Sequence, residues 1–405
     1  MNKRFTSSLG ALALGASLAA CGSASSDDGG TTDSTGPIKI ALIPPTSGAL
    51  AQFGTDAVKG WKLAVDEVNA AGGINGQKIE LIEKSTDATP ATTVREARAA
   101  VTKDGAQFIG AVMTSPEHGA LNAQLAGLGV LSMSHLGKDD SLVGEACVKN
   151  AFHISQTNSM DINALATQLG NLPGETWAIQ AVDYVTGHRA ADIFKAAAEK
   201  AGKKVVLEQF APLNTTDFGS YITKLQGSGA DSVFAAEFGA DGVAFVKQAT
   251  QFKLTDKVKT ILGFNMVSEP LFPVLGDSIA GYYNNVGYDV SADNELNTKF
   301  VEAYTEEYDS APYYVPADAY LAAQTLFAGI EEAGSSDPDK VAAALDDLTF
   351  DSIVGEVTLR GADHQLLRSS YIGQVEKTGS GLAFKILGEA TADETTPEPS
   401  SDCKL

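Results

Sequence analysis

Short apolar runs alternate with amphipathic stretches along the first third of the chain. In residues 56–71, apolar side chains from Val58 to Val68 recur at spacings of three and four, which places them on one face of a helix. Gly72 follows as a helix stop. The same pattern predicts further helices at residues 91–103 and 117–125, and strands at 38–43, 79–83, 107–112 and 129–133.

This alternation starts again in the middle of the chain. Strands separated by helices of this length are typical of βαβ units, which build parallel sheets covered by helices on both faces. Two successive runs therefore predict an α/β protein with two similar, doubly wound parallel-sheet lobes. The second run consists of predicted strands at 176–182, 205–209, 232–236 and 259–262, and predicted helices at 187–201, 216–226 and 242–252.

After residue 288 the order of elements changes. Helical patterns come first and short apolar strands come last, so these residues need not form a third domain. They can complete both lobes if the chain crosses between them several times. The predicted helices are 295–308, 317–333 and 338–345, and the predicted strands are 354–359, 370–375 and 383–387.

The first residues are typical of an export signal. Lys3 and Arg4 precede an apolar, small-residue run, and the sequence LAACG then ends in Cys21 and Gly22. The four residues LAAC at 18–21 resemble a lipobox, so we expect residues 1–20 to be removed and Cys21 to carry lipid. The alternative is an ordinary secretory signal with an incidental cysteine. Residues 21–37 are rich in Ser, Gly, Thr and Asp and are expected to form a flexible tether.

Composition narrows the possible partners. The 405 residues include 29 Lys and Arg against 51 Asp and Glu, a net charge of −22. This balance argues against nucleic acid and against electrostatic attraction to an anionic membrane surface. Hydrophobic residues at 44% and charged residues at 20% are close to globular averages. No apolar run approaches the roughly 20 residues that a spanning helix needs.

Cysteines and histidines give little support to redox, metal or catalytic chemistry. With Cys21 assigned to lipid, Cys147 and Cys403 remain, and in an exported protein they favour a disulfide over two free thiols. The five His do not occur as HxH or HxxxH, and no nucleotide-binding or hydrolase motif is present. We therefore expect no metal, no cofactor and no enzymatic activity. A scattered Ser/His/Asp triad, as in an exported hydrolase, is the alternative.

Several motifs occur in a recognisable order. The segment NAAGGINGQ at residues 69–77 is the most specific of them. The chain resembles the leucine/isoleucine/valine-binding family of ABC-transporter solute receptors over residues 38–387. The other motifs are IKI at 38–40, SG at 47–48, AQFG at 51–54, DYVTG at 183–187, DF at 217–218 and GAD at 229–231.

The resemblance implies a type I periplasmic-binding-protein fold, in which three crossovers join two lobes around one small molecule. It implies a membrane permease as partner and a monomer; a sensor module for a membrane receptor is the rival function. The crossovers are expected near residues 155–158, 283–288 and 349–354. Lobe 1 would then hold residues 38–156 and 288–350, lobe 2 would hold 157–287 and 351–390, and 391–405 would form a polar tail.

In lobe 1 the resemblance points to three loops that follow strands, where ligands of open α/β sheets bind. Phe53 matches an aromatic lid over the ligand side chain. Thr114 and Ser115 match a pair of hydroxyls that holds a carboxylate, although Ser115 is also a candidate helix cap. The third loop holds Leu136, Gly137 and Lys138, where the family uses a backbone carbonyl and a threonine. Lys138 is either solvated surface or binds an acid.

In lobe 2 the resemblance is looser. Tyr184 and Phe238 would supply apolar walls, unless they belong to the core, and Thr186 stands where amino-acid binders have an aromatic residue. Asn265 replaces the acid that partners a ligand ammonium, and Glu237 is a candidate substitute. A buried ammonium without a carboxylate is costly. The sequence therefore leaves open a branched-chain amino acid, an amide, or a carboxylate that lacks an amine.

Overall fold

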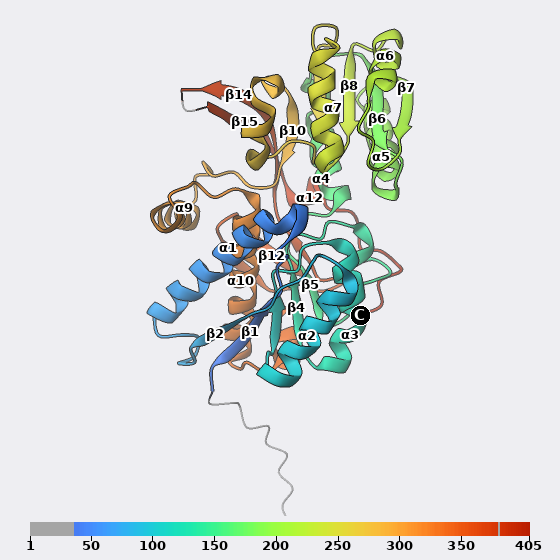
Figure 1. Ribbon diagram of the computed structural model, residues 1–405. Helices are drawn as coiled ribbons and strands as arrows, with labels where there is room; N and C mark the ends of the chain where they lie inside the picture. The colour runs from blue at the N-terminus through green and yellow to red at the C-terminus, as the bar shows by residue number, and fades with distance from the viewer. Residues whose placement is uncertain (1–35, 380) are drawn as a thin grey trace, which may run out of the picture. The chain divides into compact units, whose positions relative to one another are not determined.

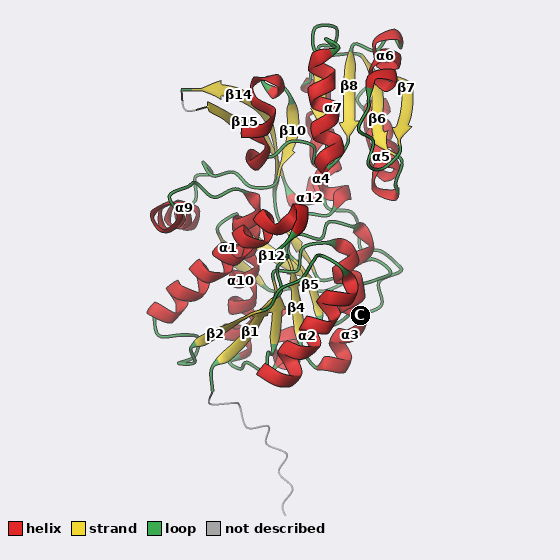
Figure 2. Cartoon of the chain, viewed as in Figure 1, coloured by secondary structure: helices red, strands yellow, loops and turns green. Residues whose placement is uncertain are grey.

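The computed structural model describes residues 36–379 and 381–405 (Figure 1). The expected signal peptide, Cys21 and nearly all of the expected tether lie outside these residues. Within the described part of the chain, no helix combines the length and the apolarity needed to cross a bilayer. The described elements build two mixed β-sheets with helices on their faces (Figure 2).

The first sheet, among the described residues, has eight strands in the order β11-β12-β13-β5-β4-β3-β1-β2. The strands β1 to β5 pair in parallel, whereas β11, β12 and β13 form an antiparallel meander at one edge. The strand bounds are β1 (Ile38–Leu42), β2 (Ile79–Glu83), β3 (Phe108–Gly110), β4 (Leu131–Ser134), β5 (Ala151–His153), β11 (Thr349–Ser352), β12 (Gly355–Arg360) and β13 (Gln365–Leu367).

Helices cover both faces of this sheet, as expected for βαβ units. The helices α1 (Ala51–Ala70) and α10 (Tyr314–Ala333) pack together in the largest hydrophobic core. The helices α2 (Pro90–Asp104) and α3 (Ser115–Leu128) contribute to a smaller core. α9 (Glu295–Tyr308) and α11 (Pro338–Leu345) join the first core.

One glycine allows the close approach of α1 and α10. A Cβ atom at Gly60 would lie 2.2 Å from the carbonyl oxygen of Pro316 and 2.9 Å from the Cβ of Ala319. No side chain fits at that distance, so Gly60 lets the two helix backbones meet. The neighbouring Trp61 is fully buried in the core that they share.

The second sheet, in the part of the chain that the structure describes, has seven strands in the order β15-β14-β10-β9-β8-β6-β7. The strands from β6 to β10 pair in parallel, and β14 and β15 are antiparallel additions at one edge. Their bounds are β6 (Thr176–Val182), β7 (Lys204–Ala211), β8 (Ser232–Ala236), β9 (Thr260–Gly263), β10 (Tyr283–Val286), β14 (Ser370–Thr378) and β15 (Gly381–Ala390).

Strand β8 shows why both faces of this sheet are apolar. Val233 and Ala235 join the core with α6 (Gly219–Gly227) and α7 (Gly239–Gln251). Phe234 and Ala236 join the core with α4 (Asn158–Gln168) and α5 (Val185–Lys200). Successive side chains of a strand point to opposite faces, so a fully buried strand needs a continuous apolar run. The short helix α8 (Phe272–Leu275) contacts α7.

The predicted fold class is confirmed, with one correction to its boundaries. The chain passes between the sheets after β5, after β10 and between β13 and β14, at Arg368 and Ser369. The third crossover was expected at residues 349–354, and residues 351–367 were wrongly placed in lobe 2. The physical reason is the tight turn between β11 and β12: it folds the chain back as a hairpin, which stays on the same sheet.

The C-terminal tail is ordered in the structure. The helix α12 (Ala392–Thr395) packs on α4, where Asn163 Nδ2 donates to the carbonyl oxygen of Thr395 at 2.8 Å. The Sγ atoms of Cys147 and Cys403 lie 2.02 Å apart, with the Cα atoms at 5.4 Å. The structure thus joins these two cysteines, and formation of the bond in the exported protein stays a prediction.

Candidate ligand-binding site

A cavity of about 390 Å³ is lined by loops that follow strands of both sheets and by the crossover after β10. All of the predicted site residues except Gly137 line it. They are Phe53, Thr114, Ser115, Leu136, Lys138, Tyr184, Thr186, Phe238 and Asn265. The loops at the carboxyl ends of parallel strands thus bring together residues that are far apart in the sequence. The volume is in the range of small-molecule pockets.

Gly137 does not line the cavity, because its backbone is packed against the interior. Its carbonyl oxygen accepts hydrogen bonds from His153 Nε2 and from Ser155 Oγ, the latter at 3.5 Å. A Cβ atom at this position would lie 2.8 Å from the ring of His118. Gly137 therefore supports the loop that carries Leu136 and Lys138 to the cavity wall.

Thr114, rather than Ser115, caps helix α3. Its hydroxyl accepts from the Glu117 backbone N–H at 3.4 Å, and its own backbone N–H donates to Glu117 Oε2 at 3.0 Å, which together form a capping box. The hydroxyl also donates to Glu117 Oε2 at 2.7 Å. Of the two roles left open for Ser115, the helix cap is wrong, because the cap is the preceding residue. Ser115 Oγ accepts from the backbone N–H of Asp139 at 3.1 Å, which leaves its own proton available to a ligand. Ser115 is thus the better candidate donor to a carboxylate.

Aromatic and aliphatic side chains form much of the wall. Phe53 is half-buried, and it packs against the first core as well as lining the cavity. Phe238 packs edge-on against Phe264, with ring centroids 5.7 Å apart, and also serves both roles. Tyr184 is 47% exposed, so it is not a core residue. Further apolar residues that were not predicted to line the cavity do so, namely Leu50, Met113, Val267, Val286, Tyr314, Val315 and Phe384.

Lys138 is the lining cation, and it is paired. Its Nζ lies 2.7 Å from Asp161 Oδ2, and the side chains are 16% and 1% exposed. It also lies 5.9 Å from the centroid of the Tyr314 ring. Lys138 is therefore neither simple solvated surface nor an unpaired positive charge. Asp161 was missed because it sits on a helix, α4, rather than in a loop after a strand.

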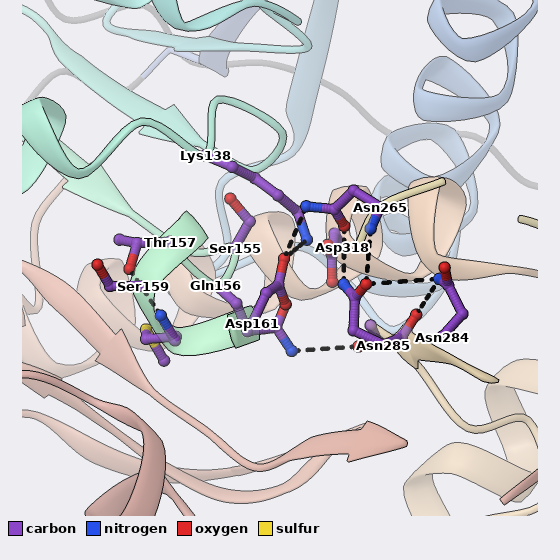
Figure 3. Close-up of polar contacts among 12 residues, drawn as sticks. Lys138, Ser155, Gln156, Thr157, Ser159, Asp161, Asn265, Asn284, Asn285 and Asp318 are labelled. Atoms are coloured by element: carbon purple, nitrogen blue, oxygen red, sulfur yellow. Dashed lines mark hydrogen bonds and ion pairs between the residues drawn. The ribbon is translucent and has the colours of Figure 1, made fainter. Parts of the chain in front are cut away.

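Asn265 is held by side-chain amides of strand β10 (Figure 3). Its backbone N–H donates to Asn285 Oδ1 at 2.8 Å, and its Oδ1 accepts from Asn285 Nδ2 at 2.7 Å. Its φ of 48° lies in the left-handed region, where Asn is among the residues best tolerated. Its Nδ2 donates to Asp161 Oδ2 at 3.3 Å. The side-chain amide of Asn265 is therefore held against Asp161, the partner of Lys138.

Glu237 does not line the cavity, whereas Glu269 and Asp139 do. Glu237 is fully buried outside the lining and accepts from Gln180 Nε2 at 2.7 Å. Glu269 is half-buried and lines the cavity. Burial raises the pKa of each carboxyl to about 7. The sequence did carry a signal for Glu269, since it follows the strand that ends at Gly263 in the same loop as Asn265.

The histidines near this region offer no chemistry to a ligand. His135 is fully buried, 6.4 Å from the Trp61 ring, and burial lowers its pKa to about 3. His188 is exposed, and its Nε2 lies 2.8 Å from Asp183 Oδ1. Across residues 36–379 and 381–405, no group of His, Cys, Asp and Glu has an arrangement suited to a metal ion.

Known proteins share both the sequence pattern and the fold. A family model described as periplasmic binding protein matches residues 37–380. The Leu/Ile/Val-binding protein homolog 8 of Brucella suis is 30% identical, over 83% of this chain and 86% of that protein. Homolog 4 of Brucella abortus is 24% identical, over 91% of this chain and 92% of that protein.

Solved structures give the same result for the fold. The leucine-, isoleucine-, valine-, threonine- and alanine-binding protein of Brucella ovis, in a closed conformation, aligns with a TM-score of 0.81 at 23% identity, over 91% of this chain and 98% of that one. A solute-binding protein of an ABC transporter from Rhodopseudomonas palustris, in complex with 4-hydroxybenzoate, aligns with a TM-score of 0.79 at 25% identity, over 88% and 97%.

Proposed function

Because this chain belongs to the periplasmic binding protein family, as its motifs predicted, we propose that it delivers one small solute to an ABC importer at the outer face of the cell membrane. It is a substrate-binding protein of the branched-chain amino acid type and not an enzyme. The observation that carries the proposal is the cavity between the two lobes, where a hydroxyl, a cation, an acid and aromatic walls meet.

The preferred ligand is a small amino acid with an apolar side chain. Ser115 and Lys138 can donate to its carboxylate, and Glu269 can accept from its ammonium, which supplies the acid that Asn265 does not. Phe53 and Phe238 would cover the side chain. Related proteins are named for Leu, Ile and Val, whereas structural neighbours hold benzoates, so a carboxylate or an amide without an amine is the competing ligand class.

The remaining parts of the proposal rest on the sequence. Cys21 would carry the lipid that anchors the protein, and the tether of residues 21–37 would let the folded body reach a permease. The binding lobes would act as a monomer. Ligand affinity for the closed arrangement would shift the lobes toward the form that the permease accepts.

A thermal-shift screen tests the function. The panel holds branched-chain and aromatic amino acids, their deaminated acids and short amides. A true ligand at a hundredfold excess over its Kd stabilises the native state by about 2.7 kcal/mol, which raises Tm. The variants Phe53→Ala and Ser115→Ala should lose the shift, whereas Ser401→Ala, an exposed serine of the tail, should keep it. Unchanged affinity in both cavity variants would reject the site.

A further inference from the structure

An ion pair at the cavity wall joins the two lobes. Lys138 follows β4 of the first sheet, whereas Asp161 belongs to α4, which packs on the second sheet. Their Nζ and Oδ2 atoms lie 2.7 Å apart (Figure 3). Lys138 lines the cavity, and Asp161 lies behind it at 1% exposure. The charge that a ligand meets at this wall is therefore that of the pair, not of the lysine alone.

Asp161 is fixed in this position. Its Oδ2 also accepts from Asn265 Nδ2 at 3.3 Å, and Asn265 is itself locked by Asn285. Asp161 lies in the first turn of α4, where the helix dipole favours a negative charge. Because the side chain is buried and its Oδ2 accepts two hydrogen bonds, a change of its rotamer would break both of them.

Lys138 still has hydrogen-bond capacity for a ligand. An ammonium group has three N–H donors, and among the described residues Asp161 is the acceptor for one of them. A ligand carboxylate bonded to Lys138 would place its oxygen about 5.5 Å or less from Asp161 Oδ2, the sum of two hydrogen bonds. Two further acids, Asp139 and Glu269, line the same cavity. A carboxylate ligand without an ammonium therefore meets more acidic than basic side chains at this cavity.

We propose that Asp161 is a positioning residue that holds Lys138 at the wall and cancels its charge, so that the site selects carboxylates that carry an ammonium over those that do not. The inference rests on the proposed function, because it concerns the ligand class of the same cavity. The acids of the cavity repel a zwitterionic ligand less than a simple carboxylate, since the ammonium of the zwitterion offsets the negative charge of its carboxylate. A like charge at this distance changes an equilibrium by about tenfold or more.

Isothermal titration calorimetry with two probes tests this selection. L-leucine and 4-methylpentanoate share a carbon skeleton, and only leucine carries an ammonium. In Asp161→Asn, the affinity for 4-methylpentanoate should rise about tenfold relative to that for leucine. The matched control is Asp241→Asn, which removes another buried acid of the second lobe. Asp241 is 6% exposed and bonds the Asn214 backbone N–H, outside the cavity lining.

The double variant Lys138→Gln/Asp161→Asn shows whether Asp161 acts through Lys138. It removes both charges, so the gain seen in Asp161→Asn should disappear. If the double variant keeps the gain in affinity for 4-methylpentanoate, Asp161 does not act through Lys138 and the positioning role is overturned. The role is also overturned if the affinity ratio of the two probes is unchanged in Asp161→Asn, or if Asp241→Asn changes it by the same factor. If folded wild-type protein binds no amino acid, acid or amide, the proposed function fails and this inference fails with it.

Discussion

A buried ion pair joins the third crossover to helix α10, and its loss should destabilise the whole fold. Arg368 Nη1 lies 2.5 Å from Asp318 Oδ1, and the two side chains are 0% and 1% exposed. A second guanidinium nitrogen, Nη2, donates to the carbonyl oxygen of Gly287 at 2.7 Å, in the crossover after β10. Arg368 thus connects helix α10 with two of the three crossovers.

Replacing Arg368 by Met leaves Asp318 buried without its partner. At an effective dielectric constant of 20, two charges about 4 Å apart attract by about 4 kcal/mol. Removing one partner of a buried pair generally costs about 3–5 kcal/mol. Since domains of ordinary stability unfold with about 5–15 kcal/mol, Arg368→Met should lose a large share of its free energy of unfolding.

Urea denaturation at two pH values measures this loss. Burial already raises the pKa of Asp318, and Arg368 opposes that rise. Without Arg368 the pKa of Asp318 in the folded state rises further, so the folded variant keeps a proton on Asp318 that the unfolded chain releases. The deficit should therefore be smaller near pH 5 than at pH 8. The double variant Arg368→Met/Asp318→Leu should recover stability. Equal losses in the single and double variants, or a loss under 1 kcal/mol, would refute the reasoning.

Three further outcomes are expected. Burial lowers the pKa of His118 and His135 to about 3, so below pH 6.5 the unfolded state binds protons that the folded state does not. The free energy of unfolding should therefore fall by about 1.4 kcal/mol per pH unit for each of these histidines as the pH is lowered. Acid denaturation of His135→Phe should show a smaller slope. Non-reduced peptide mapping should find Cys147 linked to Cys403, and two free thiols would disprove the pairing. Gly60→Ala should lower Tm in calorimetry, because its Cβ meets a carbonyl of α10 at 2.2 Å, and an unchanged Tm would mean that the helices separate easily.

The sequence determined those features that depend on neighbouring residues. The alternation of strands and helices follows from side-chain periodicity, so it predicted two α/β lobes and the loops that follow their strands. The resemblance carried by the family motifs predicted a ligand site between the lobes. Residues as distant in the sequence as Phe53 and Asn265 do line one cavity. Such loops meet because parallel strands present their carboxyl ends at one edge of a sheet.

The packing of distant elements settled which groups line the cavity and which hold the lining in place. Thr114 caps a helix, Gly137 packs inward, and Glu269 rather than Glu237 reaches the cavity. The pairing of Lys138 with Asp161 spans two lobes and has no local signature. The third crossover lies at Arg368, later in the chain than expected, because the hairpin keeps β11 to β13 on the first sheet. Periodicity records which face of an element is apolar, whereas contacts between distant polar groups depend on how whole elements pack.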